Sequence, residues 1–198
     1  MKKPLSEMTL QELWQLFPIF LVAPRTEEWT AQYARMEAEL RKMLGGFRVE
    51  GIHHVGSTAI RGIWAKPIVD ILVEIAAGES MEAAAVALER GGFRRMRSGG
   101  GRMSFNKGYT EDGFADEVFH LHLRRAGDCD EIFFRDYLNA HPDVAKSYES
   151  LKLELAPRFE HDRDGYTDAK GPFIREYTAL GRQAAGLEPI GHFDSKDT

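Results

Sequence analysis

A chain of 198 residues, 43% hydrophobic and 11% aromatic, is long enough to bury one good core, so we expect a single domain over residues 1–198. The formal net charge of −5 argues against a dedicated nucleic-acid binder, which would normally carry a basic excess. The single cysteine, Cys129, excludes an internal disulfide framework and a zinc site of several cysteines, and it fits a cytoplasmic location.

An N-terminal arm, about residues 1–26, is the first predicted segment. Its basic start is followed by acidic side chains, so we expect neither a signal peptide nor a membrane span. Residues 9–17 carry apolar side chains at helical spacing, with Thr9 and Glu12 placed for a capping box. Between Pro18 and Pro24 we expect a linker or an edge strand.

The core is predicted over about residues 27–125. It opens with a helix that ends at Gly45-Gly46 and whose apolar side chains recur every three or four residues: Trp29, Tyr33, Met36, Leu40 and Leu44. Strands over 47–55 and 68–75 flank the turn Gly56-Ser57. Because side chains alternate along a strand, one face of the second strand is apolar and the other carries Asp70, Leu72 and Glu74.

The remaining elements are a helix, a strand pair and a helical C-terminal part. A helix is predicted over 81–90, and the arginine- and glycine-rich stretch 93–101 is predicted to be a mobile loop that could close over an anion. Strands are predicted over 103–109 and 117–124. The part from about 126 to 183 is predicted to be helical, with helices over 130–139, from Pro142, and over 168–182, followed by a flexible tail at 184–198.

The turn Gly56-Ser57 is a candidate phosphate-binding element. Glycine lets backbone N–H groups approach a phosphate, and the hydroxyl groups of Ser57 and Thr58 add donors. Asp70 follows inside an apolar run, where a strand-borne carboxylate can hold Mg²⁺ against triphosphate oxygens. An ordinary turn and a salt-bridged aspartate are the alternative interpretations.

Two histidines form the second candidate group. His120 and His122 share one face of a predicted strand, roughly 7 Å apart, and could bind a transition metal, accept a proton or contact phosphate. With Asp70 on a neighbouring strand they would form a metal site of two histidines and one carboxylate. Two hydrogen-bonded structural histidines are the alternative. Among the basic residues, Lys66, Arg135 and Lys170 are candidates for contact with a polyanion, although each could equally be a solvated surface charge.

These residues resemble the signature of the GrpB family, a branch of the nucleotidyltransferase superfamily that is also found fused to dephospho-CoA kinase. The first block is 54–60, then Gly62, then 65–71. Later blocks are 119–123, 134–138 with His141-Pro142, Tyr148-x-x-Leu151-Lys152, and Tyr166-x-x-x-Lys170-x-x-Phe173-Ile174. Together they cover about residues 27–180.

The resemblance implies an α/β (α+β) nucleotidyltransferase-like fold: a small mixed sheet with helices packed on one face and a helical C-terminal segment. It also implies transfer of a nucleoside monophosphate from a nucleoside triphosphate, with Gly56 and Ser57 on the phosphates and carboxylates holding Mg²⁺. The superfamily places two acids alternately on one strand, but here Leu72 follows Asp70, so only Glu74 could serve as the second acid.

Three functional hypotheses follow. The first is a metal-dependent nucleotidyltransferase in which Asp70 and Glu74 are catalytic, with Mg²⁺ or alternatively Mn²⁺ or Zn²⁺. The second is a non-catalytic module that binds a nucleotide or a phosphorylated metabolite, which Leu72 favours. The third is a metalloprotein in which Asp70, His120 and His122 hold Zn²⁺, Mn²⁺ or Ni²⁺.

Overall fold

The fold is taken from a computed structural model, which describes residues 2–188. Of the flexible tail predicted over 184–198, residues 189–198 lie outside this range. The elements follow one another as η1 (Leu5–Glu7), α1 (Leu10–Leu16), α2 (Thr26–Met43), β1 (Val49–Val55), η2 (Ser57–Ala59), β2 (Val69–Ile75), α3 (Met81–Arg90), β3 (Arg94–Gly99), β4 (Arg102–Thr110), β5 (Gly113–Arg125), α4 (Asp130–Ala140), α5 (Pro142–Arg158) and α6 (Arg163–Ala184).

The five strands form one sheet in the order β1-β2-β5-β4-β3. β2 and β5 pair in parallel at its centre, and the other neighbours are antiparallel. β2 has the near-continuous apolar sequence of a buried parallel strand, and Ile71, Leu72 and Val73 are all fully buried. The predicted fold class, a small mixed sheet with helices, is confirmed.

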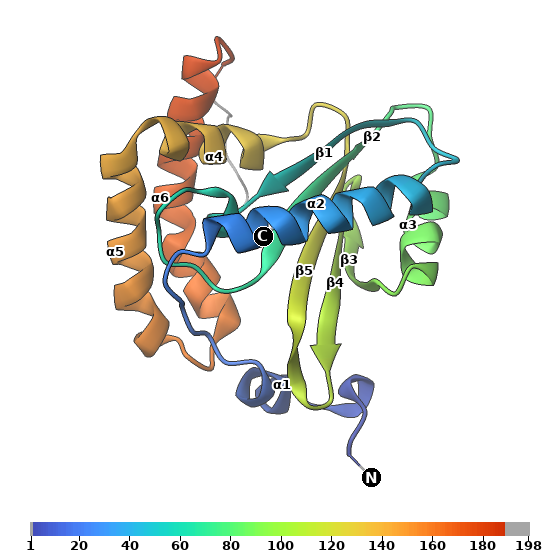
Figure 1. Cartoon of the computed structure of the whole chain (residues 1–198), viewed down its shortest axis with the longest axis horizontal. Coiled ribbons are helices and arrows are strands. Elements are labelled where there is room, and N and C mark those ends of the chain that lie inside the picture. Colours follow the sequence, from blue (N-terminus) through green and yellow to red (C-terminus); the bar gives the residue numbers. More distant parts are fainter. Residues whose placement is uncertain (1, 189–198) are drawn as a thin grey trace.

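One face of the sheet is covered by α2 and α3, as Figure 1 shows. Trp29 and Leu40 of α2 and Leu88 of α3 pack there against Ile71 of β2 and Leu121 of β5. Burying each of these side chains stabilises the folded state by about 1.5–3 kcal/mol. The alternation predicted for β2 is therefore confirmed, and the opposite face carries the polar residues of the centre of the sheet.

The C-terminal helices α4, α5 and α6 pack against the segment that joins β1 to β2 (Figure 1). Ile60 and Ile63 of that segment meet Phe134 of α4 and Tyr148 of α5 in a second buried cluster. α6 begins earlier than predicted, because the Asp162 carboxylate caps it by accepting a hydrogen bond from the Gly165 N–H at 2.9 Å. This early start adds a turn of α6 next to the Gly56-Ser57 turn.

The prediction of a mobile loop over 93–101 is wrong, because most of this segment forms the edge strand β3. β3 pairs with β4 from Arg94 to Gly99. The charges that suggested a solvated loop are compensated, since the Arg95 guanidinium donates to Glu82 at 2.8 Å and to Glu89 at 2.9 Å on α3. The sequence pattern missed this pairing because it joins residues of two separate elements.

The N-terminal arm is tied to the body of the protein. The predicted capping box of α1 is present, since the Thr9 hydroxyl accepts from the Glu12 N–H and the Glu12 carboxylate accepts from the Thr9 N–H. Further along, the Val22 N–H donates to the Ala65 carbonyl at 2.9 Å, which holds the arm beside the entry to β2. Among residues 2–188, no helix combines the length and hydrophobicity that crossing a membrane requires.

Candidate functional site

The Gly56-Ser57 turn lies directly against Asp70. Val55 pairs with Asp70 in the β1–β2 ladder, so the turn begins where the carboxylate projects. Gly56 has a φ of 69° and a ψ of −169°, a backbone conformation that residues other than glycine rarely adopt. A Cβ built at this position would lie 2.2 Å from Asp70 Oδ2. The turn can therefore approach the carboxylate this closely only with glycine at position 56.

Thr58 anchors the turn from below. Its hydroxyl donates to the Ile68 carbonyl at 3.2 Å and lies 2.9 Å from His54 Nε2, and the residue is buried. Burial lowers the pKa of His54 to about 4, so this imidazole is neutral at pH 7. Thr58, predicted to contact phosphate, instead holds the turn to the strands, while Ser57 faces a cavity.

Asp70 and the two histidines come together as the sequence predicts. The parallel register pairs Asp70 with His120 and Leu72 with His122. Asp70 Oδ1 lies 3.2 Å from His120 Nδ1 and 3.8 Å from His122 Nε2. Burial alone would raise the pKa of Asp70, but the two imidazoles outweigh it and hold this pKa well below its usual range.

A hydrogen bond with Tyr109 determines which ring nitrogen of His120 carries the proton. The Tyr109 hydroxyl lies 2.8 Å from His120 Nε2, and burial raises the pKa of Tyr109 to about 12, so the phenol keeps its proton and donates it. Burial also lowers the pKa of His120 to about 4, so the ring is neutral. We assign its one proton to Nδ1, from which it is donated to Asp70. His120 therefore positions the carboxylate and has no free lone pair for a metal.

The ring nitrogens of His122 are likewise engaged in a way that does not suit metal binding. Its Nδ1 accepts from Arg124 at 3.5 Å, which leaves the Nε2 proton facing Asp70. Within residues 2–188, no group of three histidine, cysteine, aspartate or glutamate side chains is arranged to hold a metal ion. The set Asp70, His120 and His122 thus does not fit a resident transition metal, whereas the ionised Asp70 carboxylate retains oxygens suited to Mg²⁺.

Glu74 lies apart from this group. It is four residues from Asp70, about 13 Å along the strand. Its Oε2 lies 3.0 Å from His53 Nε2, and its Oε1 accepts from the Gly127 N–H at 2.8 Å. Both carboxylate oxygens are therefore engaged elsewhere, and the side chain between the two acids on this face is the fully buried Leu72.

A cavity of about 150 Å³ opens in front of Asp70, between the sheet and the helices α5 and α6. We call it the Asp70 cavity; its polar lining consists of Ser57, Lys66, Asp70, His120, Lys152, Arg163, Tyr166, Thr167 and Lys170. Lys66, Arg163 and Lys170 form no ion pair with any carboxylate within residues 2–188. The cavity therefore gathers several cations around a single carboxylate.

The electrostatics of the lysines reflect this crowding. Burial, with the nearby charges of Arg163 and Lys170, lowers the pKa of Lys66 to about 7. Burial lowers the pKa of Lys170 to about 8, with Arg163 adding to the effect and Asp70 opposing it. Burial likewise lowers the pKa of Lys152 to about 7. An anion in the cavity would restore all three values, since it favours the charged form of each amine.

Tyr166 has a buried hydroxyl without a partner. It is 3% exposed, and its oxygen has no hydrogen-bond partner among residues 2–188. An unsatisfied buried hydroxyl costs about 1–3 kcal/mol. Tyr166 is one of the residues that line the Asp70 cavity, and Lys170 Nζ lies 4.1 Å from the centroid of its ring.

Arg135 was predicted beside these groups but lies elsewhere. It donates to the His54 carbonyl at 2.7 Å and to Asp136 at 2.8 Å. Lys152, Arg163 and Tyr166, by contrast, were not among the predicted site residues. Signals for these residues exist, because Lys152 and Tyr166 belong to the family blocks. In addition, 163, 166, 167 and 170 have the spacing of one helical face, which becomes readable once α6 is known to start at Arg163.

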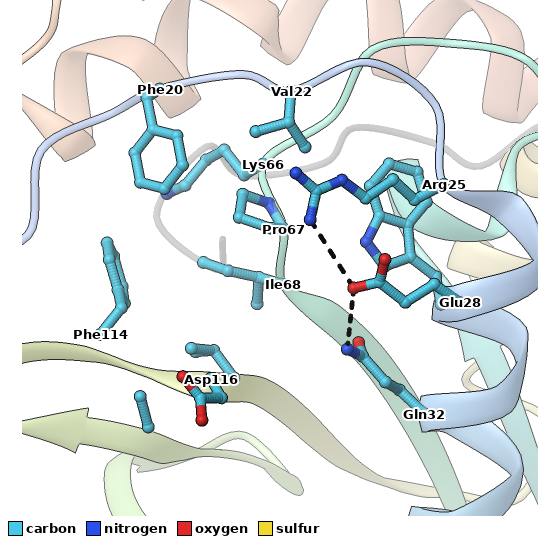
Figure 2. Close-up of a pocket in the computed structure, with 13 residues that line it drawn as sticks. Phe20, Val22, Arg25, Glu28, Gln32, Lys66, Pro67, Ile68, Phe114 and Asp116 are labelled. Atoms are coloured by element: carbon cyan, nitrogen blue, oxygen red, sulfur yellow. Dashed lines mark hydrogen bonds and ion pairs between the residues drawn. The ribbon is translucent and has the colours of Figure 1, made fainter.

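A second hollow adjoins the first. This groove of about 200 Å³ runs between the N-terminal arm, the start of α2 and the β4–β5 hairpin, and we call it the Phe114 groove. Figure 2 shows Phe20 and Phe114 on one side of it and Glu28 and Gln32 on the other. Lys66 and Ile68 line both hollows.

Comparison with known proteins gives a consistent family. The sequence model described as GrpB protein matches residues 18–180. The chain is 35% identical over 167 residues to a UPF0157 protein of Pseudomonas aeruginosa, covering 83% of this chain and 67% of that one. It is 34% identical over 169 residues to the glutamate-rich protein GrpB of Alkalihalophilus pseudofirmus, covering 79% and 92%.

A solved structure and a longer relative extend this comparison. The crystal structure of the conserved protein GrpB from Enterococcus faecalis superposes with a TM-score of 0.72 and 25% identity, covering 84% of this chain and 99% of that one. A dephospho-CoA kinase of Mycolicibacterium paratuberculosis is 29% identical over 184 residues, and the chain spans 45% of its length. Relatives of this sequence therefore occur both at similar length and within longer proteins.

Proposed function

Since the chain belongs to the GrpB family, we propose that its Asp70 cavity binds the phosphates of a nucleoside triphosphate and that the protein transfers a nucleoside monophosphate to an acceptor. The observation that carries this proposal is the convergence of Lys66, Arg163 and Lys170, without carboxylate partners in residues 2–188, on a cavity that holds one ionised carboxylate. Phosphoryl-type chemistry depends mainly on positioning and on neutralising charge, which this set can supply.

A divalent metal fits the proposal at Asp70. Mg²⁺ commonly binds through one or two carboxylates together with substrate phosphates, so Asp70 and the bound phosphates would hold it. When bound, the metal would neutralise charge that develops on the reacting phosphate. Mn²⁺ suits the same oxygen ligands, whereas Zn²⁺ or Ni²⁺ would need the imidazole nitrogens that here carry protons or accept hydrogen bonds.

The chain's own residues have distinct parts in this proposal. Lys66 and Lys170 pair with phosphate oxygens and regain their ordinary pKa values, and the Tyr166 hydroxyl gains an acceptor. His120, oriented by Tyr109, keeps the Asp70 carboxylate in one position. Gly56 leaves room for that carboxylate at the edge of the phosphate site.

A non-catalytic module that binds a nucleotide or a phosphorylated metabolite is the second candidate. Leu72 favours it, because a fully buried leucine occupies the strand position where a second acid is expected. Glu74 does not replace that acid, since both of its oxygens are engaged by His53 and Gly127. The two candidates share the phosphate site and differ in turnover.

Calorimetric titration with ATP, with and without Mg²⁺, tests the phosphate site. We expect binding that strengthens with Mg²⁺, loss of this Mg²⁺ dependence in Asp70→Asn, and weaker binding at all Mg²⁺ concentrations in Lys170→Ala. Glu74→Gln is the matched control, an acid on the same strand outside the cavity, and should bind as the unchanged protein does. Equal effects of Asp70→Asn and Glu74→Gln would contradict the site.

Pyrophosphate release separates the two candidates. The protein is incubated with each of the four nucleoside triphosphates, Mg²⁺ and a library of metabolites as acceptors. Release that disappears in Asp70→Asn, with the fold intact by circular dichroism, supports the transferase. Tight nucleotide binding that is indifferent to Mg²⁺, with no release for any acceptor, supports the binding module.

A further inference from the structure

The Phe114 groove has the composition of a site for a flat ring. Phe20 and Phe114 form its aromatic side, with ring centroids 6.1 Å apart in an edge-on arrangement. Phe20 is 41% exposed although it is a large apolar side chain. An aromatic pair open to solvent on one side gains free energy when a planar group covers it.

The groove and the Asp70 cavity are joined through shared residues. Lys66 and Ile68 line both hollows. Burial and neighbouring cations lower the pKa of Lys66 to about 7. A phosphate that contacts Lys66 from the Asp70 cavity therefore stands at the entrance of the groove. The rest of the same molecule can extend into it without leaving the protein surface.

The groove also offers hydrogen-bonding groups for the edge of a ring. On one side the Gln32 amide donates to Glu28 at 3.4 Å, and Gln32 is buried. Below Phe114, Asp116 forms no hydrogen bond or ion pair within residues 2–188 and is a free acceptor (Figure 2). Apolar lining with a few placed polar groups is the usual character of a small-molecule site.

From these contacts we propose that the Phe114 groove binds the nucleobase of the nucleotide whose phosphates occupy the Asp70 cavity. The base lies against Phe20 and Phe114, and an N–H on its edge donates to Asp116. This inference rests on the proposed function, because it assigns the second half of the same ligand. It makes the N-terminal arm and the β4–β5 hairpin parts of the site.

The test compares two ligands that differ in the nucleoside. Calorimetry in the presence of Mg²⁺ measures the affinities of ATP and of inorganic tripolyphosphate for the full chain. We expect ATP to bind more tightly than tripolyphosphate. Stacking of a base on an aromatic side chain corresponds to about a tenfold change in affinity or more. Phe114→Ala should therefore weaken the binding of ATP by about that factor and leave the binding of tripolyphosphate unchanged.

Three further variants complete the design. Phe20→Ala alters an exposed side chain and should reproduce the effect of Phe114→Ala in a protein with unchanged thermal stability. Asp116→Ala should also weaken ATP selectively. Met96→Ala alters another exposed apolar side chain, on β3 outside both hollows; it is the control and should change neither affinity.

The outcomes separate the two proposals. If tripolyphosphate binds but ATP binds no more tightly, or if Phe20→Ala and Phe114→Ala leave the ATP affinity unchanged, the nucleobase assignment is overturned and the phosphate site stands. If neither ligand binds, the proposed function itself fails. Equal weakening of both ligands by Phe20→Ala would also overturn the assignment, since it would place Phe20 on the phosphate side.

Discussion

Replacing Gly56 by alanine tests the close approach on which the candidate site depends. The new methyl group would lie 2.2 Å from Asp70 Oδ2, 2.8 Å from its Cγ and 2.9 Å from its Cβ. No real Cβ tolerates such contacts, so the turn or the carboxylate must move. The backbone conformation costs a non-glycine residue about 1–3 kcal/mol, and the crowding adds about 1–3 kcal/mol more.

Gly62→Ala is the matched control for this experiment. Gly62 has a similar φ of 70°, but nothing lies within 4 Å of its added Cβ. It therefore carries the cost of a positive φ without the crowding. We expect Gly56→Ala to lower the free energy of unfolding by about 2–6 kcal/mol, and Gly62→Ala by about 1–3 kcal/mol.

Urea denaturation followed by circular dichroism measures both values, and titration with ATP and Mg²⁺ measures the effect on the site. The crowding contribution should shrink when Asp70→Ala is combined with Gly56→Ala, because the two atoms nearest to the new methyl group are then gone. Equal destabilisation by Gly56→Ala and Gly62→Ala, with unchanged ATP binding in both, would contradict the close contact between the turn and the Asp70 carboxylate.

Tyr109→Phe keeps the ring but removes the donor that fixes the His120 tautomer, so calorimetry should give ATP binding weaker by about tenfold or more in Mg²⁺; an unchanged affinity would contradict this positioning role. Arg135→Ala removes the bond to the His54 carbonyl, so we expect a lower urea midpoint with unchanged ATP affinity, the reverse of Lys170→Ala. His120 has a folded pKa of about 4 against 6.5 unfolded, so the unfolded chain binds its proton first as the pH falls. The contribution of His120 to the free energy of unfolding is then complete above pH 6.5, and it decreases by up to about 3 kcal/mol towards pH 4. Urea midpoints for His120→Asn should show a flatter pH profile over this range.

Elements whose signals are local can be predicted from the amino-acid sequence alone. The alternation of β2, the apolar stripe of α2 and the capping box of α1 depend on neighbours within a few residues, and each is present in the structure. The blocks around Gly56, Asp70 and His120 also identified the family, because their residues lie close together in the chain.

Which of the candidate residues come together depends on how the helices and strands pack. Glu74 shares the face of Asp70 but lies too far along β2, and Arg135 is held by the His54 carbonyl instead of facing the cavity. Arg163 and Tyr166 enter the cavity because Asp162 starts α6 early and because α6 packs beside the turn. These outcomes depend on helix docking and strand register, which join residues about 50 to 100 positions apart and leave no periodic signal in the sequence.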